Sequence, residues 1–298
     1  MKNNKLFIIA NTTAGNSAGG KILQDVKELL ERREIPFHTE VTKESGHAAV
    51  LADRSLEAGY GGIVCVGGDG TLSEVVNGLA GRPARLYFVP CGTGNDFVRV
   101  LGLPADPLKA LEAQLEGKPR YIDVGQAGEY YFLNVSGGGF DTEVLRQAEH
   151  FKRLGKGIIP YFLGILVALR SFRPLDVELE IRGRTLRKQL TIFAVGNGRY
   201  YGGGMKAVPG AEIDDGFFNV VLADKVGRLR ILRLLGSFIS GKHTGLPEVR
   251  EFRCRELTVS CPGMTVNLDG ELVEMDQVHY KILPGALEVC LPERNQGL

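Results

Sequence analysis

The sequence has no tryptophan, little cysteine and no long hydrophobic run. Its five cysteines are odd in number, and none of their spacings matches a metal-binding knuckle or a redox Cys-x-x-Cys pair. Four of them stand among apolar neighbours, as small core residues do in proteins of a reducing cytosol. The longest apolar stretch, 158–169, is shorter than the ~20 residues that span a membrane, and 6–10 is too short for the apolar part of a signal peptide. We therefore expect a cytoplasmic protein.

The net charge is only +1, and several common catalytic motifs are missing. The 298 residues carry 36 Lys and Arg against 35 Asp and Glu, so no overall basic field favours nucleic acid. The five histidines show no triad or metal-ligand spacing, and the absence of a Gly-x-Ser-x-Gly motif argues against acyl transfer. Glycine, in contrast, is abundant at 40 residues, about twice its usual share. This abundance indicates many positions of unusual backbone or of close approach to a ligand.

Short apolar runs alternate with helical patterns between residues 5 and 125. The expected strands are Leu6–Ala10, Phe37–Val41, Ile63–Val66 and Arg85–Val89, and the expected helices cover 22–30, 47–58, 71–79 and 96–101. Strands that alternate with helices are typical of parallel βαβ units. The pattern therefore predicts a three-layer α/β nucleotide-binding domain with a parallel sheet over residues 1–128.

The pattern becomes β-rich after about residue 128. Runs of Val, Ile, Leu, Tyr and Phe recur between turn signals, at 130–135, 177–181, 190–195, 217–222, 257–261, 278–282 and 287–291. Helical patterns are inserted near 143–172 and 227–240. We predict a β-sandwich domain over residues 129–298, whose last few residues could return to the first domain.

One apparent phosphate-binding motif is misleading. Residues 15–21 fit Gly-x-x-x-x-Gly-Lys, but the next residue is Ile22, where a P-loop needs Ser or Thr to hold Mg²⁺. Because Ile22 also belongs to the apolar stripe of the following helix, we reject the P-loop interpretation. A glycine-rich turn from strand to helix remains, at the edge where α/β sheets bind ligands.

Two further glycine loops give a stronger signal. The strand 63–66 leads into Gly67-Gly68-Asp69-Gly70-Thr71, and the next strand leads into a second loop at 91–97, Cys-Gly-Thr-Gly-Asn-Asp-Phe. Glycines let backbone N–H groups approach phosphate oxygens, and a helix N-terminus adds partial positive charge. One such loop alone could be a turn with a capping Asp. Two at the ends of successive strands predict a shared nucleotide site.

In the second half, Asp215-Gly216 and Asp269-Gly270 are typical hairpin turns. Glu271, just after the second turn and in apolar surroundings, is less expected there, and a carboxylate could accept the proton of a hydroxyl nucleophile. Residues 225–247 contain five Lys and Arg and no acid, interleaved with Leu, Ile and Phe. Such a basic amphipathic helix either lies on an anionic membrane or packs on the core with a solvated basic rim.

At these positions the sequence resembles the diacylglycerol kinase catalytic-domain family, in particular its soluble bacterial lipid kinases. The resemblance follows the family's order along nearly the whole chain, through 11–15, 67–71, 92–97, 123–125, 137–141, 197–198, 215–216 and 269–271. Two departures stand out: Thr12 replaces a frequent Pro, and Pro90-Cys91-Gly92 replaces Pro-Leu-Gly or a similar tripeptide. Neither removes a functional group.

The resemblance implies an ATP-dependent lipid kinase, with diacylglycerol as the first expected acceptor and phosphatidic acid as the product. It implies that ATP is bound by Asn11, Thr42, Gly67, Gly68, Asp69, Gly70, Thr71, Leu72, Ser73 and Thr93. Glu271 would be the general base, with Asp69 near the Mg²⁺–phosphate centre and competing for the same role. Asp215, with the backbone carbonyls of Glu212 and Phe217, would hold a structural Mg²⁺, which Asp123 would join through water.

Other interpretations stay open. NAD kinase shares the Gly-Gly-Asp-Gly-Thr loop and a two-domain plan, and a non-catalytic nucleotide- or lipid-binding module could keep the same fold. The acceptor could be another glycerolipid, a sphingoid base or a polyprenol. Expected partners are ATP and a lipid at the membrane surface, with contact at the inner face of the membrane. Exposed strands at the edge of the second domain are compatible with a homodimer.

Overall fold

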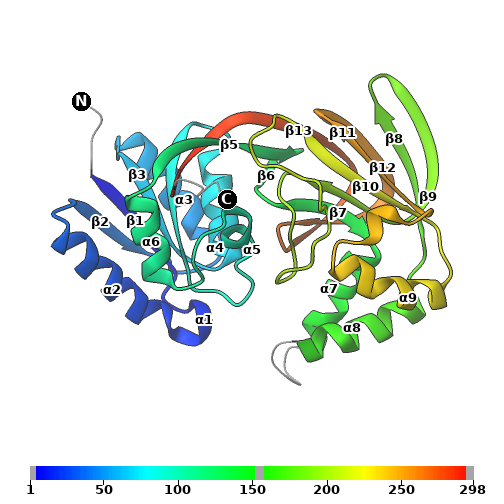
Figure 1. The fold of residues 1–298 in the computed structure, drawn as a ribbon, viewed down its shortest axis with the longest axis horizontal. Coiled ribbons are helices and arrows are strands. Elements are labelled where there is room, and N and C mark those ends of the chain that lie inside the picture. The colour runs from blue at the N-terminus through cyan, green and yellow to red at the C-terminus, as the bar shows by residue number, and fades with distance from the viewer. Residues whose placement is uncertain (1–4, 152–157, 293–298) are drawn as a thin grey trace, which may run out of the picture.

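The structure, a computed structural model, describes residues 5–151 and 158–292. Two lobes lie side by side, and the long strands β5 (Lys118–Ala127) and β13 (Glu271–Leu291) run between them (Figure 1). The first lobe holds the strands β1 to β5 and the helices α1 to α6, and the second lobe holds β6 to β12 and α7 to α9.

The first lobe alternates strands and helices, as expected. Its elements are β1 (Leu6–Ala10), α1 (Ala14–Ser17), α2 (Gly19–Arg32), β2 (Phe37–Val41), α3 (His47–Glu57), β3 (Gly62–Gly67), α4 (Asp69–Leu79), β4 (Ala84–Pro90), α5 (Asp96–Leu101) and α6 (Pro107–Leu115). β1 pairs in parallel with β2 and β3, and β4 pairs in parallel with β3 and with β13. β13 then pairs antiparallel with β5. The sheet as a whole is therefore mixed, not purely parallel.

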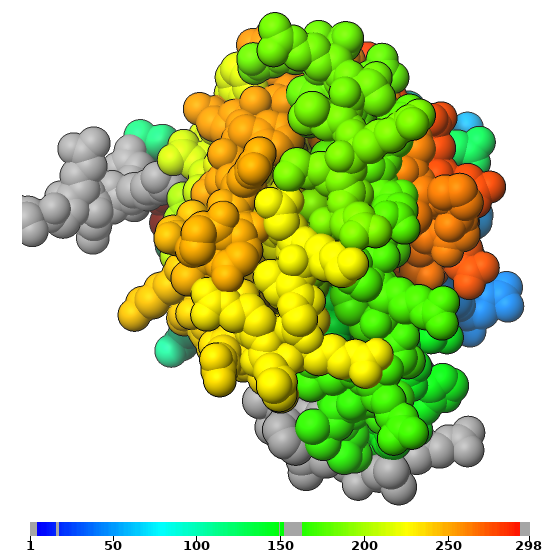
Figure 2. All heavy atoms as spheres, turned by 90° about the vertical axis from the view of Figure 1, so that its right-hand side faces the viewer, coloured from blue at the N-terminus to red at the C-terminus, as the bar shows by residue number. Residues whose placement is uncertain are grey.

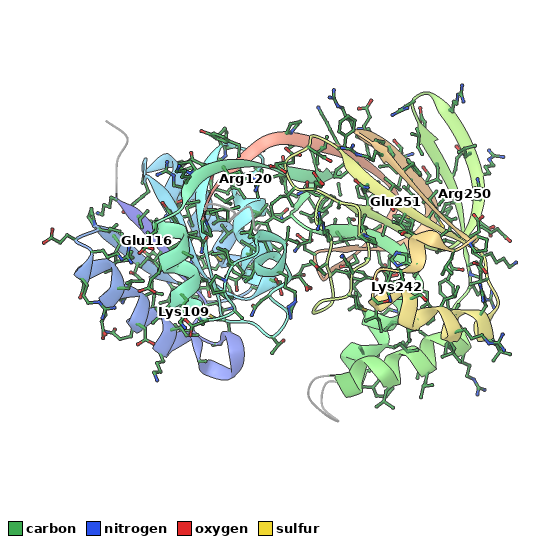
Figure 3. All side chains as sticks on the ribbon, viewed as in Figure 1. Lys109, Glu116, Arg120, Lys242, Arg250 and Glu251 are labelled. Carbon is green, nitrogen blue, oxygen red and sulfur yellow. The ribbon has the colours of Figure 1, made fainter. Side chains whose placement is uncertain are left out.

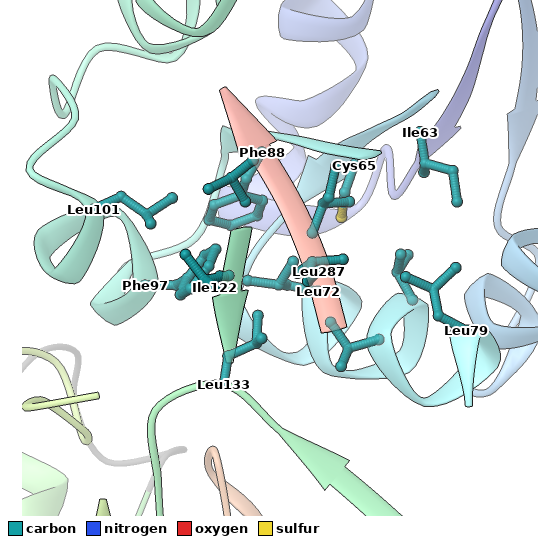
Figure 4. Close-up of a cluster of buried hydrophobic side chains, with 14 of the residues drawn as sticks. Ile63, Cys65, Leu72, Leu79, Phe88, Phe97, Leu101, Ile122, Leu133 and Leu287 are labelled. Carbon is teal, nitrogen blue, oxygen red and sulfur yellow. The ribbon is translucent and has the colours of Figure 1, made fainter. Parts of the chain in front are cut away.

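Helices cover both faces of this sheet, and β1 and β3 are therefore buried on both sides. On one face, Ile8 packs with Val26 and Leu30 of α2 and with Leu111 of α6. The residues of the other face come from β3, β4, β5, α4, α5, the segment after β6 and the last part of β13 (Figure 4): Ile63, Cys65, Leu72, Leu79, Phe88, Phe97, Leu101, Ile122, Leu133 and Leu287. Three layers result.

The second lobe is β-rich. Its elements are β6 (Tyr130–Phe132), β7 (Val135–Gly139), α7 (Phe140–Phe151), α8 (Ile158–Ser171), β8 (Leu175–Ile181), β9 (Arg184–Gly196), β10 (Phe218–Asp224), α9 (Arg228–Ile239), a 3₁₀ turn (His243–Gly245), β11 (Val249–Cys254) and β12 (Glu256–Leu268). β7 and β8 each pair antiparallel with both β9 and β12, so these four strands close a ring. Its buried aromatic residues include Phe132, Phe193, Phe218 and Tyr280.

β13 differs from the prediction made from the sequence. Two separate β-rich runs were expected there, at 278–282 and 287–291. The structure joins them into one strand of 21 residues, which pairs with β12 at its start and with β4 at its end. The register shifts between Leu283 and Leu287, and Gly285 there has a φ of 61°. Pro284-Gly285 therefore forms an irregularity within a strand and not the turn that the sequence suggests.

The three helices α7, α8 and α9 lie together on one side of the second lobe (Figure 1). Ile231 of α9 shares a hydrophobic cluster with Ala168 and Leu169 of α8 and with Phe140 of α7. Within the described residues, no helix is both long and apolar enough to cross a bilayer. All five cysteines are buried and unpaired.

Candidate functional site

The carboxyl ends of four strands place the first group of expected residues at one edge of the sheet. Backbone hydrogen bonds continue the strand register just past these ends, from Thr42 N–H to Ala10 O (2.9 Å), from Asn11 N–H to Val66 O (2.9 Å) and from Cys91 N–H to Gly67 O (2.7 Å). The segments that follow β1, β2, β3 and β4 therefore lie next to one another.

Asn11 links two of these segments. Its side-chain N–H donates to Thr71 Oγ1 at 3.2 Å, and its Oδ1 accepts the N–H and the hydroxyl of Thr13 at 3.1 and 2.8 Å. Thr71 is buried in the first turn of α4. Asn11 thus fastens the loop after β1 to the glycine loop after β3.

The two glycine loops approach each other backbone to backbone. A methyl group on Gly67 would lie 2.5 Å from Thr71 Cβ, and one on Gly92 would lie 2.9 Å from Gly68 Cα. No larger residue fits at either position. Gly68 is also the N-cap of α4 and offers no side-chain acceptor, so the N–H groups of the first turn are available to an anion.

Asp69 reaches from the first glycine loop to the second. Its Oδ1 accepts the backbone N–H of Asp96 at 2.9 Å, and a methyl group on Gly94 would lie 2.6 Å from its Oδ2. Burial raises the pKa of the Asp69 carboxyl, and the N–H groups of residues 95–97 act in the opposite direction. Asp69 therefore lies at the N-terminus of α5 as well as at the start of α4.

Asp96 is buried and connects this edge to the second lobe. Its Oδ2 accepts the N–H of Gly203 at 2.8 Å. Its Oδ1 has no hydrogen-bond partner within the described residues, and the nearest cation, Arg99 Nε, is 4.0 Å away. Burial raises the pKa of the Asp96 carboxyl, and the nearby charge of Asp69 raises it further. A buried carboxylate oxygen without a hydrogen-bond partner is suited to bind a cation such as Mg²⁺.

The hairpin between β12 and β13 brings Glu271 to the same place. Leu268 pairs with Glu271 across Asp269-Gly270, whose φ values are 51° and 105°, which confirms the expected two-residue turn. A methyl group on Gly70 would lie 3.6 Å from Glu271 Oε1. Glu271 of the second lobe thus lies against the glycine loop of the first.

Asp269 holds this hairpin in place. Its carboxylate accepts the N–H groups of Leu133, Asn134 and Val135 at 2.6, 2.9 and 2.9 Å. Burial raises the pKa of the Asp269 carboxyl to about 7, although the three N–H groups lower it. Asp269 therefore fixes the direction in which Glu271 leaves the turn.

Three other expected ATP-binding residues differ in what they can offer. Thr93 is exposed between the glycines of the second loop and is free to meet a ligand. Leu72 packs its side chain into the core and donates its N–H to Gly68 O, so it supports the loop from behind. Ser73 is buried one residue further into α4.

The expected structural Mg²⁺ site is a loop whose two carboxylates already have partners. Asp123 accepts the N–H groups of Gly216 and Gly285 at 2.7 and 2.8 Å. Asp215 accepts the N–H of Phe217 at 2.9 Å and forms an ion pair with Arg253. The neighbouring Asp214 pairs with Arg120. Glu212 is exposed. As arranged, this donor set does not fit Mg²⁺, because Arg253 supplies the positive charge; within the described residues no cluster of three or more acidic, His or Cys side chains has metal-site geometry.

Sequence reasoning missed one contributor to the site, the backbone of Gly203. Three consecutive glycines, Gly202, Gly203 and Gly204, do indicate an unusual turn at this position. The residue that the turn contacts, Asp96, is 107 positions away in the other lobe, so the contact itself has no local signal in the sequence.

Comparison with known proteins agrees with this arrangement. Residues 5–127 match the family model of the diacylglycerol kinase catalytic domain. Residues 134–291 match the model of the YegS C-terminal NAD kinase beta sandwich-like domain. The two matches meet between β5 and β7.

Individual proteins are similar along most of the chain. A diacylglycerol kinase of Staphylococcus saprophyticus is 32% identical over 267 residues, which cover 89% of this chain and 88% of that protein. One of Staphylococcus carnosus is 30% identical over 96% of this chain and 94% of its own. The crystal structure of a diacylglycerol kinase from Bacillus anthracis superposes with a TM-score of 0.81 at 25% identity and covers 98% of this chain and 99% of that one.

Proposed function

Because the chain belongs to the diacylglycerol kinase catalytic-domain family, we propose that it transfers the γ-phosphate of ATP to a lipid hydroxyl, with diacylglycerol as acceptor and phosphatidic acid as product. One observation carries the proposal. The Glu271 carboxylate of the second lobe lies against Gly70 in the glycine loop that opens α4. A proton acceptor and a phosphate-binding loop thus meet at one place, as phosphoryl transfer to a hydroxyl requires.

In this proposal residues 1–128 hold ATP and residues 129–298 hold the lipid. The glycine loops fit the phosphates because side chains are excluded at Gly67 and Gly92, which leaves backbone N–H groups to face the anion. Asn11, Thr42, Thr71 and Thr93 line the same edge and supply hydroxyl and amide groups to the nucleotide. The other residues expected there, Gly68, Asp69, Gly70, Leu72 and Ser73, shape the loop itself.

The chemistry asks for a proton acceptor and for neutralised charge. Glu271 takes the proton of the lipid hydroxyl as its oxygen attacks the γ-phosphorus, and ADP leaves. Mg²⁺ bound with ATP would neutralise charge on the phosphates. Asp69, and Asp96 through its unpartnered Oδ1, are the carboxylates placed to hold that ion. Asp69 and Glu271 stay in competition for the role of base.

A second Mg²⁺, at Asp215 with the carbonyls of Glu212 and Phe217, stays a prediction. It requires Arg253 to leave Asp215, whereas Asp123 can keep its two N–H donors, because each carboxylate oxygen accepts more than one hydrogen bond. No step of the reaction is derived from it.

We infer that the lipid is reached from the surface formed by α8 and α9. Leu229, Leu232 and Leu166 are 74%, 45% and 48% exposed, and α8 and α9 lie side by side on one face (Figure 2). Arg228 and Arg233 flank Leu229 and Leu232 in α9 and have no ion-pair partner within the described residues. An apolar stripe edged by free cations is typical of a helix on an anionic bilayer. This arrangement supports peripheral contact with the inner face of the membrane.

The other partner expected from the sequence is a second copy of the chain. Within the described residues β11 is a free edge of the sheet, and its exposed side chains include Arg250 and Glu251 (Figure 3). Charged side chains on an edge strand oppose strand-to-strand pairing. Sedimentation velocity decides whether a homodimer forms.

The function is tested with radiolabelled ATP and Mg²⁺ against a panel of lipids in mixed micelles, with NAD as a separate acceptor. We expect one labelled lipid, lost in Glu271→Gln while ATP affinity is retained. Glu274→Gln, on the same strand, is the matched control and keeps the rate. Label on NAD alone would establish NAD kinase, and ATP binding without any labelled product would indicate a binding module.

A further inference from the structure

Residues 201–205 form a tight loop, built mainly of glycine. Tyr201 and Met205 pair as an isolated antiparallel bridge, with hydrogen bonds of 3.1 Å in both directions. Between them Gly202, Gly203 and Gly204 have φ values of 62°, 83° and 111°. Only glycine adopts these positive φ values at low energetic cost, so each of the three positions favours glycine.

The tip of the loop lies against the residues that open α5 in the first lobe. The Gly203 N–H donates to Asp96 Oδ2 at 2.8 Å, and the N–H of Gly204 also lowers the pKa of Asp96. A methyl group on Gly94 would lie 3.8 Å from Gly203 Cα, and one on Gly204 would lie 3.3 Å from Arg99 Nε. The tip therefore contacts the second glycine loop and the first turn of α5 together.

The base of the loop is fixed to the second lobe. Tyr201 is buried, and its hydroxyl donates to the carboxylate of Asp141, the second residue of α7. Its ring packs edge-on against Phe238 of α9, with centroids 6.4 Å apart. Side chains from two helices of the second lobe thus hold the residue from which the glycine tip projects.

We propose that loop 201–205 positions the Asp69 carboxylate opposite Glu271 by gripping Asp96 from the other lobe. Two hydrogen bonds carry the effect: Gly203 N–H binds the Asp96 carboxylate, and Asp96 N–H binds the Asp69 carboxylate. The proposal rests on the proposed function for its kinetic consequence. Gly203 and Tyr201 are positioning residues, because they act through Asp96 and through the base of the loop.

Gly203→Ala tests the tip, because a side chain at a φ of 83° forces the backbone away from Asp96. Gly183→Ala is the matched control: Gly183 has a φ of 71° in the β8–β9 turn and nothing lies within 4 Å of an added methyl group. We expect kcat to fall about tenfold or more in Gly203→Ala, with the KM for ATP changed less than about threefold. The control should keep both constants, with a similar shift in melting temperature.

Tyr201→Phe tests the base of the loop without adding an atom. We expect kcat to fall about threefold to tenfold, again with little change in KM. If Gly203→Ala fails to fold, this variant carries the kinetic test. Equal kcat values in Gly203→Ala and Gly183→Ala, or an unchanged kcat in Tyr201→Phe, would overturn the proposal.

Hydrogen exchange tests the contact independently of activity. Asp96→Ala removes the acceptor, so the amides of a peptide covering 198–207 should exchange about fivefold faster or more than in the wild type, while β10 keeps its protection. If the exchange rates in 198–207 are the same in Asp96→Ala and in the wild type, the loop is not held by Asp96. If the wild type phosphorylates no lipid, but Asp96→Ala still exchanges faster than the wild type in 198–207, the proposed function is refuted and the contact stands.

Discussion

Asp69 and Asp96 are the first residues of two neighbouring helices, and the Oδ1 atom of Asp69 accepts the backbone N–H of Asp96 at 2.9 Å. The two carboxylates are close enough for the charge of Asp69 to raise the pKa of Asp96. Two neighbouring negative charges, one buried on Asp96 and one half-buried on Asp69, require a positive partner. Helix N-termini and Arg99 supply part of it, and the Mg²⁺ of a nucleotide would supply the rest.

Asp69→Asn separates the charge of this residue from its structural role. The amide oxygen still accepts the Asp96 N–H, so the melting temperature should change little. We expect kcat to fall about a hundredfold or more, because a group that holds a metal or moves a proton in the transition state has been lost. Asp69→Ala, which also loses the acceptor, should cost a further ~1–3 kcal/mol of stability. A fully active Asp69→Asn would remove Asp69 from the reaction.

Gly94→Ala should inactivate the enzyme without unfolding it. The added methyl group would lie 2.6 Å from Asp69 Oδ2, so Asp69 must turn away from its present position. Gly245→Ala is the control, because nothing lies within 4 Å of a methyl group there. We expect kcat to fall at least tenfold in the first variant only, with both variants melting within a few degrees of the wild type. Normal turnover in Gly94→Ala would show that the position of Asp69 is not critical.

Thr71→Val tests the link between Asn11 and the glycine loop. The substitution keeps the shape of the side chain and removes the acceptor of the 3.2 Å hydrogen bond. We expect a loss of ~1 kcal/mol in the free energy of unfolding and a KM for ATP raised severalfold. Thr191→Val, which removes a buried hydroxyl that donates to Asp224 O and accepts the N–H of Val226 in the second lobe, should lose at least as much stability and keep its KM. Equal KM values for the two variants would contradict a role of Thr71 in binding ATP.

The buried Asp141 should make stability depend on pH. Burial raises the pKa of its carboxyl from 3.8 to about 6, against the hydrogen bond of the Tyr201 hydroxyl. Because the folded protein holds this proton more tightly than the unfolded chain, the free energy of unfolding falls as pH rises from about 4 to about 6. Asp141→Asn keeps an oxygen acceptor for Tyr201 and cannot ionise.

We therefore expect the stability of Asp141→Asn, measured against wild type by urea unfolding, to be relatively greater at pH 7.5 than at pH 4.5. Above about pH 7 the difference should no longer change. The same difference at both pH values would show that Asp141 does not titrate in this window.

Reversing two charges on α9 should weaken membrane binding. Arg228→Glu with Arg233→Glu changes cations that have no ion-pair partner within the described residues, whereas Arg230 pairs with Glu248 and is left in place. Because each basic residue near an anionic surface contributes ~1 kcal/mol, binding to phosphatidylglycerol vesicles should fall about tenfold or more. Arg184→Glu with Arg250→Glu, the same charge change on β9 and β11, should bind like the wild type in vesicle sedimentation. Equal loss in both pairs would indicate an effect of net charge alone.

Local patterns in the sequence predicted the elements that depend on neighbouring residues. The βαβ alternation, the two glycine loops and the Asp269-Gly270 turn were all predicted, because each is determined by residues within a few positions of one another. One local signal was overlooked: Asp106 caps α6, with Pro107 at its first position. That pair marks a helix start without any need of a structure.

Contacts between the lobes could not be predicted in the same way. The hydrogen bond between Gly203 and Asp96 depends on how the two lobes pack against each other. The ion pair of Arg253 with Asp215 lies within the second lobe, but it also depends on a distant strand, and it places a side-chain cation where the family resemblance implied a metal. When the neutralising charge comes from a distant strand, the sequence next to the neutralised residue contains no signal of it.

The course of β13 also bears on how the chain is made. β13 follows all the other strands in the sequence, yet its end lies between β4 and β5 in the sheet of the first lobe. As the chain leaves the ribosome, the edge of β4 stays open until the last part of β13 has been synthesised, although the other strands of that lobe are already present. An open parallel edge is a template for pairing with other chains. Newborn chains therefore stay vulnerable to aggregation until the end of β13 has emerged, and a fragment that stops at residue 270 would keep that vulnerability permanently.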